Sequence, residues 1–249
     1  MRSSLVGRAD VALPATRLTS TPRAWRVDAL VALVALVLLV AWDATGGDLW
    51  AVRRFGTAQG FAWQNQWFAA QVLHTGGRWL GLGVLAALIF NLWRPLPLAH
   101  GMSRRLRLWW LLATISCLVF IPLLKSRSLI SCPWDLAEFG GLAHTVSHWS
   151  LQAWAGVGDG GPGRCFPSGH SSTAFAFLAG WFALRGHSTR AARLWLAGVL
   201  VLGVVFSVAQ TMRGAHYPSH SLWTAWLCWV LTAGLWHAFG TPRMPSTGT

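Results

Sequence analysis

The sequence of 249 residues contains little charge and few acidic groups. Charged residues make up 11% of the chain, and only 7 residues are Asp or Glu, whereas an ordinary soluble domain carries about 25% charged residues. A soluble chain of this length would need a charged surface around its core, so the composition excludes an ordinary soluble globular domain. The sequence also lacks internal repeats and low-complexity domains.

Long hydrophobic blocks are present instead. Hydrophobic residues account for 54% of the chain and the mean hydropathy is +0.45. Six blocks lie at about 27–42, 79–93, 106–124, 171–184, 192–209 and 222–239. Several are shorter than the ~20 residues that span a bilayer, so their ends must extend into polar positions. Because a chain in lipid must satisfy its own backbone hydrogen bonds, we expect an all-α polytopic membrane helical bundle with about six spans.

These blocks divide the chain into a basic N-terminal tail at 1–26, a transmembrane domain at 27–240 and a C-terminal tail at 241–249. With the N-terminus in the cytoplasm, thirteen of the 20 basic residues lie on the cytoplasmic side, which is the side that positive charge favours. The basic residues are spread between the blocks rather than gathered in one stripe, which argues against nucleic-acid binding. The oligomeric state has no signal in the sequence.

Two long segments lie on the opposite, outer side. Residues 46–77 are long enough to include a short interfacial helix. Residues 125–167 form the longest stretch outside the blocks. Lys125 begins this stretch, where a basic residue at the end of a span is often only an interfacial anchor.

The second outer segment ends in Pro167, Ser168, Gly169 and His170, directly before the fourth block. Backbone N–H groups of Ser168 and Gly169 at a helix N-terminus would favour an anion. Ser168 adds a hydroxyl donor, and His170 can exchange a proton near neutral pH. The alternative interpretation is an ordinary helix start with a serine N-cap.

Residues 210–220, between the fifth and sixth blocks, contain a second polar cluster. Arg213 offers a planar fork of donors suited to phosphate oxygens. His216 and His220 are four residues apart, so one helical turn would place them on one face, where one ring could fix the tautomer of the other. Interfacial polar residues are the alternative, although Arg beside two histidines is costly at membrane depth.

Together these segments resemble the type 2 phosphatidic-acid phosphatase superfamily, the membrane relatives of vanadium haloperoxidases. The resemblance covers about residues 125–229. Lys125 and Pro133 have the spacing of the family's first motif, His216 matches the third, and the second is matched in full by Pro167, Ser168, Gly169 and His170.

The chain departs from the family pattern at three places. Cys132 stands at the arginine of the first motif, Ala209 and Gln210 at the Ser-Arg of the third, and His220 at its aspartate. Arg213, nearly one helical turn after Gln210, could replace one missing guanidinium, and Arg164 or Arg127 the other. His220 is a weaker orienting partner than a carboxylate, and Asp135 is a distant substitute.

The resemblance implies a phosphatase that uses neither a metal nor another cofactor. His216 would attack phosphorus, His170 would protonate the leaving oxygen, and His220 would orient His216. Phosphate oxygens would be held by Lys125, Arg164, Ser168, Gly169 and Arg213. The expected substrates are lipid phosphates or pyrophosphates such as undecaprenyl pyrophosphate, phosphatidic acid or lipid A, acted on at the outer face of a bacterial inner membrane. A lipid-to-lipid phosphotransferase and a non-catalytic lipid-phosphate binder are the alternatives.

Histidine and cysteine pairs in the outer loop suggest two further features. His144 and His148 are four residues apart and could bind zinc with Glu138 or Asp135, but the His-Glu-x-x-His pattern is lacking and nearby arginines would repel a cation. Cys132 and Cys165 both lie beside motif residues, and in an oxidising periplasm they could form a disulfide that braces the site.

Overall fold

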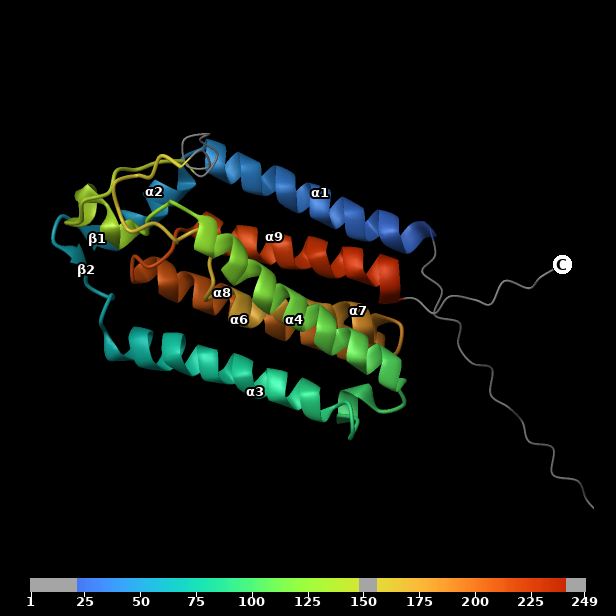
Figure 1. Cartoon of the computed structure of the whole chain (residues 1–249). Helices are drawn as coiled ribbons and strands as arrows, with labels where there is room; N and C mark the ends of the chain where they lie inside the picture. Colours follow the sequence, from blue (N-terminus) through green and yellow to red (C-terminus); the bar gives the residue numbers. More distant parts are fainter. Residues whose placement is uncertain (1–21, 148–155, 241–249) are drawn as a thin grey trace, which may run out of the picture.

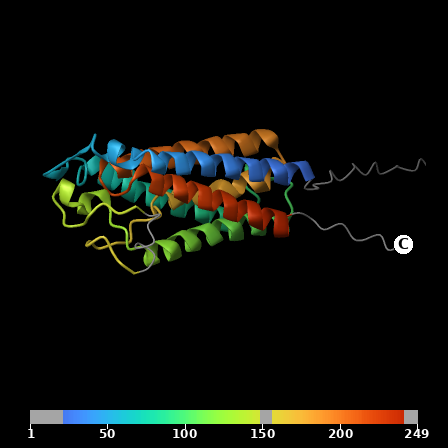
Figure 2. The same ribbon diagram turned by 90° about the horizontal axis from the view of Figure 1, so that it is seen from above.

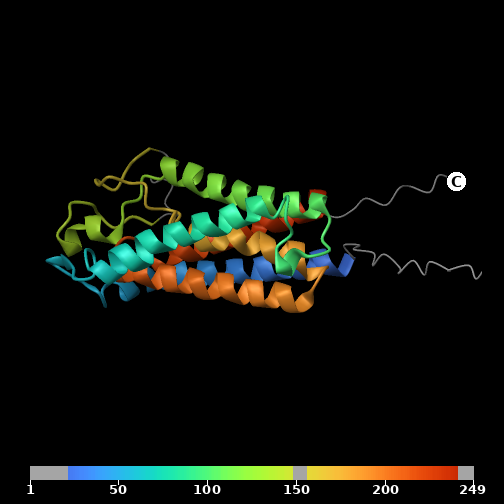
Figure 3. The same ribbon diagram turned by 90° about the horizontal axis from the view of Figure 1, so that it is seen from below.

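A computed structural model of the chain describes residues 22–147 and 156–240. The long helices lie side by side in one bundle, which Figure 1 shows from the side and Figures 2 and 3 from above and below. The main helices are α1 (Pro22–Ala44), α3 (Gly77–Phe90), α4 (Arg104–Arg127), α8 (Thr189–Met212) and α9 (Pro218–Leu235). The predicted all-α membrane bundle is confirmed.

Four helices are long and apolar enough to cross a membrane: Ala24–Ala44, Phe68–Phe90, Arg104–Arg127 and Thr189–Met212. The fourth predicted block is instead broken into α6 (Ser172–Phe175), the 3-10 helix η5 (Ala176–Leu178) and α7 (Ala179–Arg185). Ala176, Ala179 and Phe182 in this segment are fully buried. It is therefore an internal element of the bundle, which explains why it is shorter than a lipid-facing span.

Two predicted boundaries differ from those of the structure. Helix α1 begins at Pro22, before the start of the first predicted block at about residue 27, and proline is favoured in the first turn of a helix. The second block was expected to begin at Trp79, but a π-helix, η1 (Phe68–Gly76), runs directly into α3. The glycines at 76 and 77 do not end the helix, because every backbone group in lipid must be paired internally. The C-terminal tail 241–249 lies outside the described residues.

Short elements gather at one end of the bundle (Figure 1). They are α2 (Gly47–Val52), the antiparallel hairpin of β1 (Gly56–Thr57) and β2 (Gly60–Phe61), and the 3-10 helices η3 (Pro133–Asp135) and η4 (Ala137–Phe139). Helix α2 is the short helix expected within residues 46–77. At the opposite end, η2 (Pro97–Ala99) joins α3 to α4, and the described chain begins at α1 and ends at the π-helix η6 (Trp236–Gly240).

A buried ion cluster ties the elements together at this opposite end. Asp28 of α1 accepts two hydrogen bonds from Arg185 of α7, at 2.7 and 2.8 Å, and lies 2.8 Å from Nε2 of His237. The tryptophan ring of Trp229 donates to the Asp28 carbonyl at 3.2 Å. This ion cluster is separate from the loop end of the bundle, where the short elements gather.

Candidate active site

Four histidines converge at the loop end of the bundle. His74 lies in η1, His170 in the turn before α6, and His216 and His220 at the junction of α8 and α9. The rings of His74 and His170 are stacked, with centroids 4.5 Å apart, and those of His216 and His220 are 6.0 Å apart. Segments that are far apart in the sequence thus bring four histidine rings together at one site.

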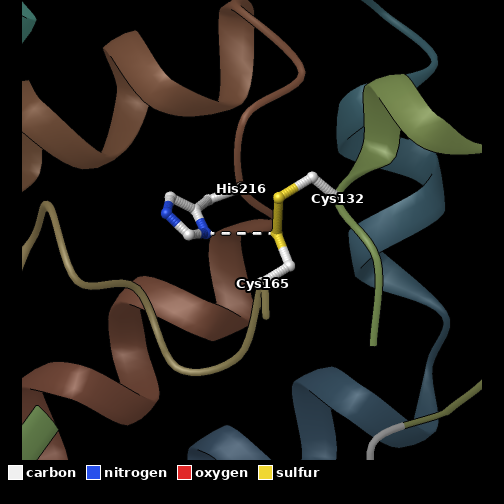
Figure 4. A group of neighbouring side chains, drawn as sticks. All are labelled: Cys132, Cys165 and His216. Atoms are coloured by element: carbon white, nitrogen blue, oxygen red, sulfur yellow. Dashed lines mark hydrogen bonds between the residues drawn. A yellow bond between two sulfur atoms is a disulfide. The ribbon is translucent and has the colours of Figure 1, made fainter. Parts of the chain in front are cut away.

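His216 rests against the disulfide between Cys132 and Cys165, as Figure 4 shows. Its Nδ1 lies 3.4 Å from Sγ of Cys165. A disulfide sulfur has no proton to donate, so this contact is a hydrogen bond when Nδ1 carries the proton and the lone pair lies on Nε2. Burial lowers the pKa of His216 well below its usual value, and the charges of Lys125 and the other histidines add to this.

His220 acts on this arrangement through Cys165. Its Nδ1 lies 3.0 Å from the Cys165 carbonyl oxygen, and its ring packs edge-on against Phe166 and Tyr217. The sequence predicted that His220 orients His216, and the two rings lie edge to face. The Nδ1 atoms of both rings also lie close to Cys165, which is bridged to Cys132.

His170 is held by η1. Its ring donates to the Leu73 carbonyl, stacks on His74 and meets Phe206 at 5.5 Å. Its Nε2 is buried and has no hydrogen-bond partner among the described residues. Burial, followed by the charge of His74, lowers the pKa of His170 to about 4. His74 was missed by the sequence analysis because the second block was drawn from Trp79, beyond it.

Two cations flank the histidines. The side chain of Lys125 lies along Gly169, where an added Cβ would be 3.3 Å from Lys125 Cδ and 3.7 Å from Nζ. Arg213 donates through Nε to the Gln64 carbonyl at 2.9 Å and through Nη1 to Oε1 of Gln210 at 3.3 Å. Gln210, which stands where the family has an arginine, therefore holds Arg213, nearly one helical turn later in the chain. Partial burial lowers the pKa of Arg213.

Ser168 is buried and Arg164 is exposed. The Ser168 N–H donates to the His220 carbonyl at 3.1 Å. Its buried hydroxyl lies 3.0 Å from that of Ser171, which in turn donates to Ser221 at 2.8 Å. Ser168 is therefore committed to joining α6 to α9, and its N–H is not available to an anion. Arg164 is exposed, and the structure shows only its backbone bound, to Ser128.

The disulfide suggested by the sequence is present, with Cα atoms 5.1 Å apart. Sγ of Cys132, Sγ of Cys165 and a ring nitrogen of His216 lie within 4.8 Å of one another. The two sulfurs are bonded to each other, so they are not thiolates and this group does not fit a cation. Of the alternative zinc pair, His144 is exposed and His148 lies outside the described residues.

Acidic groups near the site are occupied by other partners. Asp48 of α2 accepts from the Ser219 N–H at 2.9 Å, from the Ser219 hydroxyl and from the Trp42 ring. It thereby caps the start of α9, the helix that carries His220. Glu138 forms an exposed ion pair with Arg53 at 2.6 Å. The positive charge of Lys125 and Arg213 consequently remains available to an anion.

Comparison with known proteins bears on the whole of this region. A family model described as the PAP2 superfamily matches residues 106–244, which is more than half of the chain and runs from the first turn of α4 to beyond α9. Neither the curated proteins nor the solved structures contain a match to this chain.

Proposed function

The chain belongs to the PAP2 superfamily, a family of phosphatases, and on this premise we propose that it hydrolyses a lipid-linked phosphate or pyrophosphate through a phosphohistidine. The observation that carries the proposal is the position of His216. Its Nδ1 lies beside Sγ of Cys165, and a proton on Nδ1 leaves the Nε2 lone pair free to attack phosphorus.

The reaction has two balanced steps. In the first, Nε2 of His216 forms a bond to phosphorus while the bond to the leaving oxygen breaks, and protonated His170 gives its proton to that oxygen. In the second, His170, now neutral, takes a proton from water. The water oxygen bonds to phosphorus as the bond to Nε2 breaks. The pKa of about 4 belongs to the empty site, and bound phosphate would raise it through its negative charge.

Positive charge and one backbone donor stabilise the transferring phosphoryl group. Lys125 and Arg213 flank the histidines, and we assign the backbone N–H of Gly169, a residue packed against the Lys125 side chain, as the backbone donor. Arg164 would reach the phosphate from the exposed rim. Preorganised donors of this kind account for most of the catalysis in phosphoryl transfer, where positioning and charge dominate. No step requires a metal ion.

The location of the site supports a lipid substrate. It lies at one end of a bundle whose helices expose many large apolar residues, such as Leu30, Leu33 and Leu38 of α1. We place this end at the outer face of a bacterial inner membrane and both termini in the cytoplasm, on the distribution of Lys and Arg. Undecaprenyl pyrophosphate, phosphatidic acid, phosphatidylglycerol phosphate and lipid A are the candidate substrates.

The same intermediate allows a lipid-to-lipid phosphotransferase, in which a lipid hydroxyl replaces water. Gln210 and His220, at positions where the family has Arg and Asp, favour a third candidate, a binder that retains the site without turnover.

The test is phosphate release by detergent-purified protein from a panel of lipid phosphates and pyrophosphates, with EDTA present. His216→Ala is compared with wild type, and His144→Ala, a change at an exposed loop histidine, serves as the matched control. Release that survives EDTA and is lost only in His216→Ala supports the proposal. Absence of release by wild type, even with a lipid alcohol as acceptor, would identify a binder.

A further inference from the structure

An apolar groove lies directly below the stacked histidines. It has a volume of about 200 Å³ and is enclosed by α3, the α6–η5 segment and α8. Figure 3 shows α3 passing in front of this segment, between α4 and α8. Its lining includes Leu80 and Val84 of α3, Phe177 of η5, and Leu194, Gly198 and Phe206 of α8.

The groove adjoins the candidate active site through two of its lining residues. Phe206 lines it and contacts the ring of His170, with centroids 5.5 Å apart. Thr173 also lines it and donates its hydroxyl to the His170 carbonyl at 2.7 Å. A phosphate held between His170 and His216 therefore lies close to the end of the groove at Phe206 and Thr173.

The groove also has the depth and the opening that a lipid chain requires. With a rise of 1.5 Å per residue, Leu194 lies about 18 Å below Phe206 along α8. Leu80 and Leu194 on its rim are 46% and 64% exposed, so a chain can enter sideways from the bilayer without crossing water.

We propose that one hydrocarbon chain of the lipid phosphate itself, not a bulk bilayer lipid, occupies this groove while its phosphate is at the histidines. The proposal rests on the proposed function and adds to it the path of the substrate between α3 and α8. A chain in this position would fix the depth of the phosphorus atom relative to Nε2 of His216.

A second apolar groove, of about 710 Å³, lies between α1, α7, α8 and α9. It is larger, but its lining contains none of the residues that contact His170, namely His74, Thr173 and Phe206. Contact with His170 therefore favours the smaller groove, and the larger one provides a comparison.

Glycines in the helices allow a sharp test. A Cβ at Gly198, in the groove, would meet nothing within 4 Å, and the same holds for Gly83 of α3, which does not line it. Gly198→Phe would therefore fill the groove, Gly83→Phe is the matched control, and Ala35→Phe would fill the larger groove. The quantity measured is the ratio of kcat/KM for a long-chain lipid phosphate to that for a short-chain, water-soluble one.

We expect the ratio to fall at least about tenfold in Gly198→Phe, because a displacement of about 1 Å at the reacting atom can cost about 100-fold in rate. The two other variants should keep the wild-type ratio. An unchanged ratio in Gly198→Phe, or a fall in Ala35→Phe alone, would overturn the proposal. It would indicate that bulk bilayer lipid, not the substrate, occupies the groove.

A binding measurement separates this proposal from the proposed function. Failure of wild type to release phosphate from either substrate would contradict the hydrolysis and not the groove. The inactive His216→Ala protein would then be photolabelled with a lipid phosphate that carries a photoreactive group in its chain. Helix α8 lines both grooves, so the helices that line only one of them decide. Labelling in residues 77–90 supports the groove, and labelling in 22–44 or 218–235 without any in 77–90 overturns the proposal.

Discussion

Sγ of Cys165 lies 3.4 Å from Nδ1 of His216, and the carbonyl oxygen of Cys165 lies 3.0 Å from Nδ1 of His220. One residue of the Cys132–Cys165 bridge therefore contacts both rings of the α8–α9 junction. At the position where the family's third motif has a carboxylate, this chain has His220. We therefore propose that this covalently fixed cysteine helps to orient the nucleophile.

Reduction of the bridge should lower kcat. Without the bond to Cys132, Cys165 can move, and both histidines lose a fixed partner. We expect a fall of about tenfold, since small displacements of catalytic groups are costly. The measurement is phosphate release before reduction, after dithiothreitol and after reoxidation.

A double variant, Cys132→Ser with Cys165→Ser, is the control, because it should have the low kcat in both conditions. Thermal unfolding of the reduced protein separates loss of orientation from loss of the fold. A reduced wild type that is folded and keeps full kcat would contradict this role of the bridge.

The pH dependence of kcat/KM should reflect His170. Its pKa in the empty site is lowered to about 4, first by burial. The protonated form, needed to donate to the leaving oxygen, predominates below that pH and falls about tenfold per pH unit above it. Because kcat/KM reports the free enzyme, we expect it to decline from about pH 4 upward, with kcat declining only at higher pH.

His170→Gln should lose this decline together with most of the activity. A kcat/KM that stays level between about pH 4 and 7 in wild type would show that His170 is not the proton donor.

His74→Phe should shift the same profile. The substitution keeps a ring against His170 but removes an ionisable neighbour whose charge lowers the pKa of His170. The pKa of His170 should therefore rise, and the decline in kcat/KM should begin at higher pH. His100→Phe, a change at the opposite end of the bundle, is the matched control, and an equal shift in both variants would exclude a specific effect of His74.

Hydropathy and short motifs predict the bundle and the three motif segments, because these features depend on nearby residues. The contact of His74 with His170 joins positions 96 residues apart, and the contact of Asp48 with Ser219 joins positions 171 apart. Neither contact can be recognised from a single sequence. The motif Pro-Ser-Gly-His suggests an anion site at Ser168, yet tertiary packing gives its N–H to His220.

Asp48→Ala should destabilise the protein. It leaves the N–H and hydroxyl of buried Ser219 without their acceptor, and an unsatisfied buried donor costs about 1–3 kcal/mol. The midpoint of thermal unfolding, measured by tryptophan fluorescence, should fall. Asp48→Asn keeps an acceptor oxygen and should lose less, because burial already raises the pKa of the aspartate and disfavours its charge. Equal losses would show that the hydrogen bonds to Ser219 are not the cause.

Arg213 and Arg164 should differ sharply in their contribution to turnover. Arg213 is fixed by Gln64 and Gln210 beside the histidines, whereas Arg164 is exposed. Removal of one preorganised donor to a developing oxyanion costs about 100- to 1000-fold in kcat, so Arg213→Ala should show a loss of this order. Arg213→Lys keeps the charge without the planar fork and should recover only part of it.

Arg164→Ala provides the comparison, because an exposed arginine that approaches the phosphate only on binding should affect KM more than kcat. Both constants are measured with one soluble short-chain substrate, so that membrane partitioning does not enter. If Arg164→Ala lowered kcat as much as Arg213→Ala, both guanidiniums would act on the transition state, and Arg164 would have to move inward from its exposed position. If neither variant lowered kcat, the transferring phosphate would depend on Lys125 and the backbone alone, and the assignment of Arg213 as the replacement for the missing motif arginine would be wrong.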